Sequence, residues 1–401
     1  MKVLMLADSY PPFIGGGERH VQSLSRELTR RGHEVIVCTI GGRELSRYED
    51  EDSVKVHRFE GLFQKIPFLY KDPVRKKHPP AQDWIITRKL AHIIKQERPD
   101  IIHVHGRMLY SALPLKRGSE IPLLVTLHDY ALFCPTTGLT KKNNICDKPF
   151  TKDCIACGRD KYGLVKSLAA YYGVKTNKNK LKSVDKFIAV SSFVRQVYAK
   201  HLGLSDKDVL MIPNFYSPEA ESKSEKGMEL PEDFILFVGA LAPHKGVNLL
   251  IEAYYKLNAK TKLVMIGGKR PDYRYESTED ILVIEDAPHD IVMQAMSRCR
   301  FAVFPSICAE AFGIVVLEAM SQKKAVIASD IGGLKDVIID SQTGILVPPN
   351  NSDKLAEAIS HLLQSPERAS EMAQKGYERF MKNYTPEAVV PMIIDVYQGL
   401  K

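Results

Sequence analysis

The sequence has no long apolar stretch. None of its apolar runs approaches the roughly 20 residues that a membrane-spanning helix requires. Residues 1–8 meet charged side chains too soon to form a secretory signal peptide. The sequence therefore predicts a protein of the cytoplasm.

Two common phosphate-binding signatures are also missing. There is no P-loop, and the glycines at 15–17 do not follow the Gly-x-Gly-x-x-Gly spacing of a dinucleotide site. No acidic residue ends the second predicted strand, 35–40, where such a site would bind a ribose. An ordinary dinucleotide-binding domain is therefore not indicated.

What the sequence does contain is an alternation of short apolar runs with helical stretches, which is typical of buried parallel strands. The predicted strands are 3–7, 35–40, 101–105, 123–129, 187–191 and 209–213, then 235–239, 262–267, 281–284, 301–305, 325–329 and 344–348. A chain of 401 residues is long enough for two domains of roughly 200 residues each. We predict an α/β protein with two doubly wound, Rossmann-like domains that face each other across a cleft.

The domain boundary is expected where periodicity is lost. The segment 217–227 is charged and aperiodic, which is typical of a hinge or surface connection. We therefore predict one domain over 1–214, with an insertion at about 130–160, and a second over 215–383. The remaining helix, 384–401, is expected to pack back on the first domain.

Charge is divided unequally between these halves. Residues 1–214 carry 36 Lys and Arg against 22 Asp and Glu, or +14, whereas residues 215–401 carry 20 against 26, or −6. This asymmetry suggests an anionic partner for the first half, such as nucleic acid or anionic lipid. A basic surface that merely aids solubility explains it equally well.

Two glutamates lie close together in the sequence. Glu310 lies in a predicted strand-to-helix turn, and Glu318 lies about 12 Å further along, in the predicted helix 312–322. In α/β proteins the free N–H groups at such a turn bind phosphates. Carboxylates beside it could accept hydrogen bonds from the hydroxyls of a sugar and a ribose. Two glutamates on a solvated helix are the alternative explanation.

The glycines at 15–17 follow the first predicted strand. At that edge of a sheet, glycine allows the backbone to approach a ligand closely. A flexible surface loop is the alternative.

Many short motifs together resemble the retaining glycosyltransferases of family 4, which have the GT-B fold. The matching segments are Pro-Pro at 11–12, Gly-Gly-Gly-Glu-Arg-His-Val at 15–21, Arg-Gly-His-Glu-Val at 31–35, Pro-Asp-Ile-Ile-His-Val-His at 99–105, Thr-Leu-His-Asp at 126–129, Ile-Ala-Val-Ser at 188–191, Ile-Pro-Asn at 212–214, Val-Gly at 238–239, Lys-Gly at 245–246, the 310–318 segment, 326–333 and 343–349. The resemblance implies hexosyl transfer, with retained configuration, from a nucleoside-diphosphate sugar to a hydroxyl of a glycan, lipid-linked or small-molecule acceptor.

The resemblance also implies roles for single residues. Glu310 would contact the hydroxyls of the transferred sugar, and Glu318 the ribose. The donor site would further include Gly15, Gly16, Gly239, Lys245, Phe312, Gly313 and Ile314, with Lys245 neutralising phosphate charge. His128 would touch the donor sugar near the reaction centre, although a histidine that caps a strand end is the structural alternative.

One position departs from the family pattern. Many relatives carry an arginine after the glycine of the Val-Gly pair, but here Ala240 follows Gly239. A bidentate contact to the diphosphate is therefore missing, so that leaving-group charge would fall to Lys245 and backbone dipoles, with no metal and no cofactor.

Four of the seven cysteines lie within 24 residues, at Cys134, Cys146, Cys154 and Cys157. Clustered thiols in a cytoplasmic protein suggest a structural zinc, but this spacing matches no familiar zinc motif. Reduced buried thiols or a disulfide remain open.

Apolar and basic residues also mix at 59–77, where Phe59, Phe63, Phe68, Leu69 and Tyr70 alternate with lysine and arginine. Such a segment could contact an anionic membrane at its inner face. The alternatives for the whole chain are a nucleotide-sugar epimerase or another GT-B enzyme, or a basic module that binds nucleic acid or membrane.

Overall fold

The computed structural model describes residues 1–13, 15–42, 45–66, 70, 76–141, 144–218, 228–257, 260–268 and 278–401. The chain divides into two compact units. The first comprises Met1–Lys141, Cys146–Pro213 and Val389–Lys401, and the second comprises Lys142–Ile145 and Asn214–Ala388. The predicted connection at 217–227 lies mostly outside the described residues.

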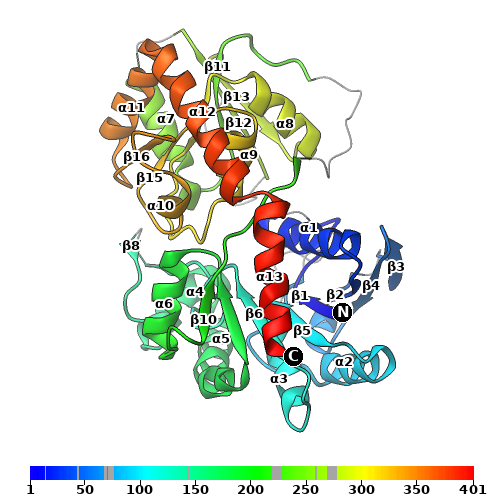
Figure 1. Cartoon of the computed structure of the whole chain (residues 1–401). Helices are drawn as coiled ribbons and strands as arrows, with labels where there is room; N and C mark the ends of the chain where they lie inside the picture. Colours follow the sequence, from blue (N-terminus) through cyan, green and yellow to red (C-terminus); the bar gives the residue numbers. More distant parts are fainter. Residues whose placement is uncertain are drawn as a thin grey trace. The chain divides into compact units, whose positions relative to one another are not determined.

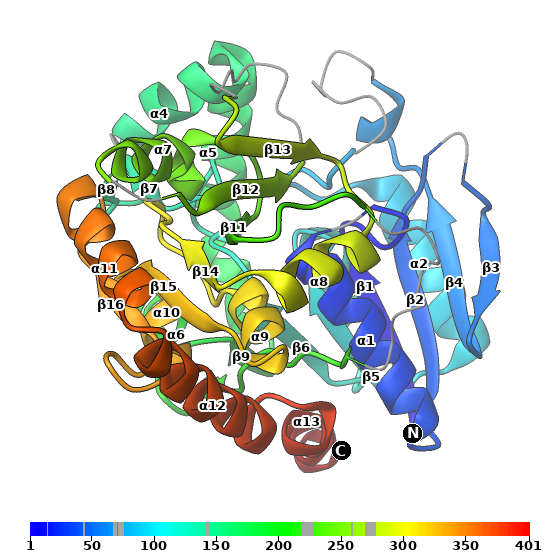
Figure 2. The same cartoon turned by 90° about the horizontal axis from the view of Figure 1, so that it is seen from above.

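The first unit is built on a sheet of eight strands in the order β10-β9-β6-β5-β1-β2-β4-β3 (Figures 1 and 2). These strands are β1 (Lys2–Ala7), β2 (Glu34–Ile40), β3 (Tyr48–Glu51), β4 (Val54–Phe59), β5 (Ile101–His105), β6 (Leu123–Leu127), β9 (Lys186–Ala189) and β10 (Val209–Met211). All neighbours are parallel except β3 and β4. β1, β5 and β6 are buried along almost their whole length, as expected for strands covered on both faces.

The helices of the first unit are α1 (Gly16–Arg30), α2 (Trp84–Glu97), α3 (Leu109–Lys116), α4 (Asp153–Tyr162), α5 (Leu164–Asn177) and α6 (Ser192–Leu202), with the 3-10 turns η1 (Phe63–Lys65) and η3 (Lys178–Ser183). Two short strands, β7 (Thr140–Lys141) and β8 (Asn144–Ile145), precede α4. Local caps define several helix ends. The Asp83 carboxylate, for example, accepts hydrogen bonds from the Ile85 and Ile86 amides at the start of α2.

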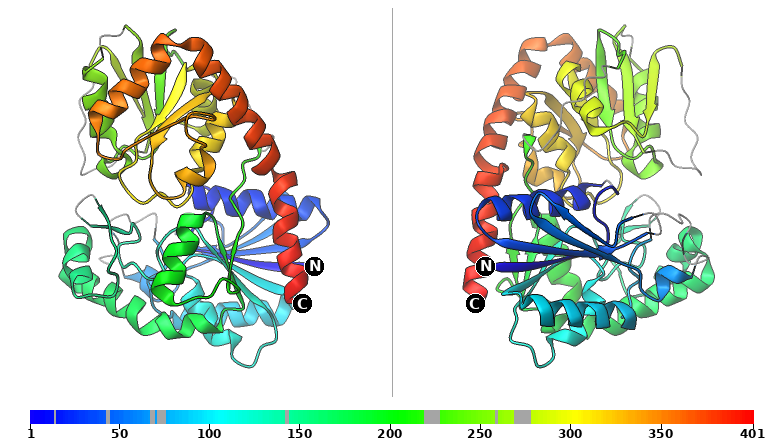
Figure 3. Two further views of the ribbon diagram at one scale, coloured as in Figure 1. Left: turned by 60° about the vertical axis from the view of Figure 1, so that its left-hand side comes forward. Right: turned by 90° about the vertical axis from the view of Figure 1, so that its right-hand side faces the viewer.

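The C-terminal helix α13 (Pro386–Leu400) ends the chain within the first unit, where the two termini lie near each other (Figure 3). The Tyr397 hydroxyl lies 2.7 Å from His103 Nδ1 on β5, and Lys401 forms an ion pair with Asp100. These contacts join the C-terminal segment to β5 and to the residue just before it.

The second unit has six parallel strands in the order β13-β12-β11-β14-β15-β16. They are β11 (Phe234–Val238), β12 (Lys262–Gly267), β13 (Ile281–Glu285), β14 (Phe301–Phe304), β15 (Ala325–Ser329) and β16 (Ile345–Val347). The accompanying elements are η5 (Pro243–Lys245), α7 (Val247–Tyr255), α8 (His289–Arg298), α9 (Ile314–Ser321), α10 (Leu334–Val337), α11 (Ser352–Gln364) and α12 (Pro366–Asn383).

Both sheets confirm the predicted doubly wound architecture, and each has a point where the strand order reverses. It lies between β1 and β5 in the first unit and between β11 and β14 in the second. Ligands of open α/β sheets bind at the carboxyl ends of strands beside such points. The candidate site residues are therefore expected just beyond the carboxyl ends of β1, β5, β11 and β14.

The structure adds an edge that the sequence did not indicate. Strands β3 and β4 extend the first sheet beyond β2, and β3 is antiparallel. Helix α9 also begins at Ile314 rather than at 312, because Gly313 before it is in the left-handed conformation, with φ 99°. No helix among the described residues is long and apolar enough to cross a membrane.

Candidate active site

The turn between β14 and α9 carries Glu310. Gly313 caps α9 with a positive φ, and a side chain there would lie 2.6 Å from Leu334 Cδ2. Glycine is therefore required at this position. The N–H groups of Ile314 and Val315 have no carbonyl partner within the helix and form a potential anion site, whereas the Val316 amide already donates to the Gly313 carbonyl.

Two further glycines, Gly332 and Gly333, hold the backbone of Glu310. A Cβ on Gly332, whose φ is +59°, would lie only 2.2 Å from the Glu310 carbonyl oxygen. The Gly333 amide donates a hydrogen bond of 2.8 Å to the same carbonyl. Any residue larger than glycine at 332 would displace Glu310, so these two glycines position the carboxylate.

The structure brings Lys245 and Glu310 together. Lys245 Nζ lies 2.6 and 2.8 Å from the two carboxylate oxygens, and the side chains are 26% and 17% exposed. The His244 carbonyl accepts hydrogen bonds from the Ile307 and Cys308 amides, which ties η5 to the Glu310 turn. Gly246 also packs so closely on Pro305 that a Cβ would clash with its carbonyl.

This ion pair controls the charge of both partners. Burial acts to raise the pKa of Glu310, but the Lys245 ammonium more than offsets it and holds the pKa below its usual value. Burial likewise acts to lower the pKa of Lys245, and Glu310 reverses that effect. The pair is therefore ionised at neutral pH and offers one cation and one anion to a ligand.

Glu318 lies within α9 and is only 5% exposed, which rules out the alternative of a solvated helix face. Its carboxylate is 3.8 Å from His289 Nε2, at the start of α8. Gly239 follows β11 at the strand-order reversal, and Phe312 is buried with its ring 5.9 Å from that of Tyr384. Glu318 is thus buried beside His289, and Gly239 lies at the carboxyl end of β11.

In the first unit, His128 lines a cavity of about 220 Å³ with Asp8, Glu18, Lys77 and His105. Burial raises the pKa of Asp8 to about 6, although the amides of Arg107 and Met108 donate hydrogen bonds to its carboxylate. The Asp8 carboxyl can therefore hold or release a proton near neutral pH.

His128 is not a simple strand-end cap, because it pairs with another histidine. Its Nε2 lies 2.9 Å from Nδ1 of His105, and the two rings are stacked. Burial lowers the pKa of His128 to about 4 and that of His105 well below its usual value, so both rings are neutral at pH 7. One proton then lies between them.

The two outer nitrogens of this pair, His105 Nε2 and His128 Nδ1, are buried and make no hydrogen bond to any described residue. Whichever ring donates to the other, one outer nitrogen is a donor and the other an acceptor. A ligand hydroxyl, which both donates and accepts, suits these requirements.

The glycines at 15–17 start helix α1. Gly15 is its N-cap and has extended backbone, and Gly16 is exposed. A side chain at Gly17 would meet nothing within 4 Å. Packing within the protein therefore does not explain the glycine at 17, which is consistent with a ligand that approaches this backbone.

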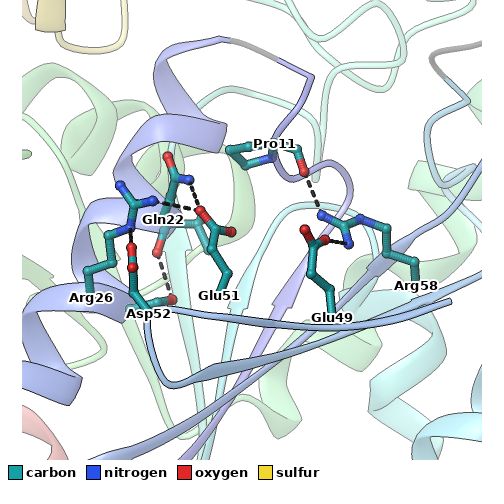
Figure 4. Close-up of polar contacts among 9 residues, drawn as sticks. Pro11, Gln22, Arg26, Glu49, Glu51, Asp52 and Arg58 are labelled. Carbon is teal, nitrogen blue, oxygen red and sulfur yellow. Dashed lines mark hydrogen bonds and ion pairs between the residues drawn. The ribbon is translucent and has the colours of Figure 1, made fainter. Parts of the chain in front are cut away.

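A buried arginine, Arg58, contacts the segment that precedes these glycines (Figure 4). Arg58 on β4 is 5% exposed, donates a hydrogen bond of 2.7 Å to the Pro11 carbonyl and pairs with Glu49 on β3. Its guanidinium also lies 6.0 Å from the Tyr10 ring. The β3–β4 edge thus fixes the segment that leads to Gly15.

We expect Arg58→Ala to lower kcat about tenfold to hundredfold, because a displacement of about 1 Å in a positioning segment has effects of that size. Arg26→Ala is the matched control. Arg26 joins α1 to the same edge through Glu51 and Asp52 but makes no contact with Pro11 in the described structure. Steady-state kinetics and melting temperatures of both variants test this expectation. An equal loss of kcat in both variants would show that any disturbance of the β3–β4 edge has this effect, and not the loss of the Arg58–Pro11 hydrogen bond.

The cysteines of the insertion give no support to a metal centre. All seven cysteines are free thiols, so the disulfide alternative is not seen. Among the described residues, which include Cys134, Cys146, Cys154 and Cys157, no group of three or more ligands could hold a metal. A structural zinc stays a prediction for metal analysis.

Comparisons with known proteins agree with this architecture. The family model for glycosyltransferase family 4 matches residues 14–220, and that for glycosyl transferases group 1 matches residues 219–379. An uncharacterized glycosyltransferase of Methanocaldococcus jannaschii is 29% identical over 100% of this chain and 99% of its own. A glycogen synthase of Mycobacterium tuberculosis is 24% identical over 100% and 95%.

Solved structures give the same fold. The sucrose-phosphate synthase of Thermosynechococcus elongatus matches with a TM-score of 0.76 at 19% identity, over 100% of this chain and 99% of its own. Anabaena HepE in complex with UDP-glucose matches with a TM-score of 0.70 at 15% identity, over 100% of each chain.

The two Rossmann-like units have the GT-B fold of glycosyltransferases. The chain belongs to glycosyltransferase family 4. It is therefore a transferase, and a pure binding module no longer accounts for it.

Proposed function

We propose that this protein transfers a hexosyl group from a nucleoside-diphosphate sugar to an acceptor hydroxyl, with retention of configuration. The observation that carries the proposal is the Lys245–Glu310 ion pair beside the N-terminus of α9, at the strand-order reversal of the second unit. A cation and free amides suit a diphosphate, and a fixed carboxylate suits sugar hydroxyls.

Each candidate residue has a distinct part in this proposal. Lys245 and the amides at Gly313 and Ile314 would stabilise the departing diphosphate, while Glu310 orients the sugar. Glu318 would bind the ribose, and Gly239 would allow close approach of the nucleotide. No step requires a metal or cofactor.

The first unit would supply His128 and the glycines at 15–17. The unsatisfied nitrogens of the His105–His128 pair support contact with a hydroxyl, and the open space beside Gly17 supports contact with the donor. In the mechanism that we propose, the acceptor attacks on the side of the leaving group, so its proton would pass to a phosphate oxygen of the departing diphosphate. Phosphate then acts as the base, and a protein nucleophile is unnecessary.

Relatives support a nucleotide-sugar donor. The Anabaena structure contains UDP-glucose, and the starch synthase IV of Arabidopsis thaliana was solved with ADP and acarbose. The test is thermal stabilisation by UDP, GDP and ADP, followed by transfer assays with the matching sugars. Stabilisation by none of the three, at concentrations that saturate related enzymes, would refute the donor assignment.

We also propose that the acceptor is a glycan or lipid-linked glycan and that the protein associates peripherally with an anionic membrane at its inner face. The segment at 59–77 that suggested this lies partly outside the described residues. Within the described part, Phe59 is buried and Lys89 stands over its ring. Support for membrane contact therefore has to come from another surface.

A further inference from the structure

Helix α5 presents an apolar outer face to solvent. Its inner face is buried on α4, where the Ser167 hydroxyl donates a hydrogen bond of 2.6 Å to the Ile155 carbonyl. On the other side, Val165 is 78% and Tyr172 56% exposed. Seven residues make almost two helical turns, so these two side chains lie on one line, within about 20° of each other.

The neighbouring residue Leu164 is 55% exposed and extends this apolar surface to the start of the helix. Large apolar side chains this exposed are uncommon when they adjoin one another, and such patches usually mark a binding surface. We call the surface formed by Leu164, Val165 and Tyr172, together with the lysines of α5 and of the η3 turn that follows it, the α5 surface.

The segment that carries the lysines of the α5 surface contains no acidic residue. Between Tyr162 and Val184 the chain contains no aspartate or glutamate, and its five lysines are Lys166, Lys175, Lys178, Lys180 and Lys182. On the helix, Lys166 and Lys175 flank the Val165–Tyr172 line at about 80–100° on either side. Among the described residues, none of the five forms an ion pair with a carboxylate.

We infer that the α5 surface contacts an anionic lipid bilayer, with Leu164, Val165 and Tyr172 at the headgroup boundary and the lysines over the lipid charges. This rests on the proposed peripheral association and assigns it a surface. Apolar side chains flanked by lysines are typical of helices that lie in a membrane interface.

Other occupants fit this surface less well. A second copy would oppose five lysines to five lysines, and the like charges would repel. Nucleic acid would satisfy the lysines but gives no role to Val165 or Leu164. An anionic bilayer satisfies both the charge and the apolar area.

The test is sedimentation of the full chain with vesicles of phosphatidylcholine alone and of phosphatidylcholine mixed with phosphatidylserine. The wild type is expected to bind only the mixed vesicles, and less at high salt because the charges are screened. Tyr172→Asp, and the combined replacement of Lys166, Lys175, Lys180 and Lys182 by glutamine, should each weaken binding about tenfold or more.

A matched control is Tyr255→Asp on α7, where the tyrosine has nearly the same exposure, 53%. It should bind vesicles as the wild type does.

If Tyr172→Asp and the glutamine variant also bind vesicles normally, the assignment of membrane contact to the α5 surface is wrong, while peripheral association stands. If the wild type binds no vesicles, both fail, and transfer to a soluble acceptor still tests the proposed reaction. Binding to random RNA that needs these lysines, without vesicle binding, would likewise overturn the inference.

Discussion

Glu310→Ala is expected to lower kcat for glycosyl transfer about 10²- to 10³-fold. The carboxylate would lose its contact with the sugar, and removal of one preorganised hydrogen-bonding group at a reaction centre typically costs this much. The substitution also leaves Lys245, only 26% exposed, without its counter-charge. That unpaired charge lowers the pKa of Lys245 and weakens the site for diphosphate as well.

Glu310→Gln separates these two causes, because the amide keeps the shape and one hydrogen-bond acceptor but not the charge. Melting temperatures of both variants show whether the turn itself survives. Glu318→Ala is the contrasting variant, since Glu318 contacts His289 and not Lys245. It should raise the donor KM about tenfold and leave kcat within a few-fold; equal effects of the two alanine variants on both parameters would contradict the division of roles.

The strands around these residues were predictable because buried parallel strands are continuous apolar runs. β14, for example, is Phe-Ala-Val-Phe between Arg300 and Pro305, and all four residues are buried. The edge strand β3, Tyr-Glu-Asp-Glu, was not predicted, because three acidic residues in four are typical of a loop. It forms a strand because Arg26 and Arg58, distant in sequence, pair with its carboxylates.

The site residues also fall into those that the local sequence could predict and those that depend on contacts between distant segments. Gly313 and Glu310 were recognisable from a local strand-turn-helix pattern. The pairing of Lys245 with Glu310, across 65 residues, and the packing of Gly332 on the Glu310 backbone depend on two loops that meet only in the folded unit. The His105–His128 pair was hidden likewise, although each histidine ends or follows a predicted strand, and neighbouring β5 and β6 are what bring them together.

Lys245→Met is expected to lower kcat about 10²- to 10³-fold as well, and for a different reason. Methionine retains the apolar stem but removes the cation that would meet the developing diphosphate charge. The Val-Gly pair is followed by Ala240, so no guanidinium at that position compensates. Lys245→Arg keeps a cation and should retain more activity than Lys245→Met.

The pH profile distinguishes this effect from simple loss of binding. In the wild type, Lys245 holds the pKa of Glu310 below its usual value against the opposing effect of burial. Without the ammonium, burial dominates and the pKa rises, so Glu310 is protonated at a higher pH. The acid limb of kcat should therefore move to higher pH in Lys245→Met and stay in place in Lys245→Arg. An unshifted acid limb in Lys245→Met would mean that ionised Glu310 does not limit the reaction.

Adding Ala240→Arg to the Lys245→Met variant tests whether a guanidinium beside Gly239 can replace the missing charge. If kcat recovers while the acid limb stays at the higher pH, the cation stabilises the diphosphate and Glu310 orients the sugar.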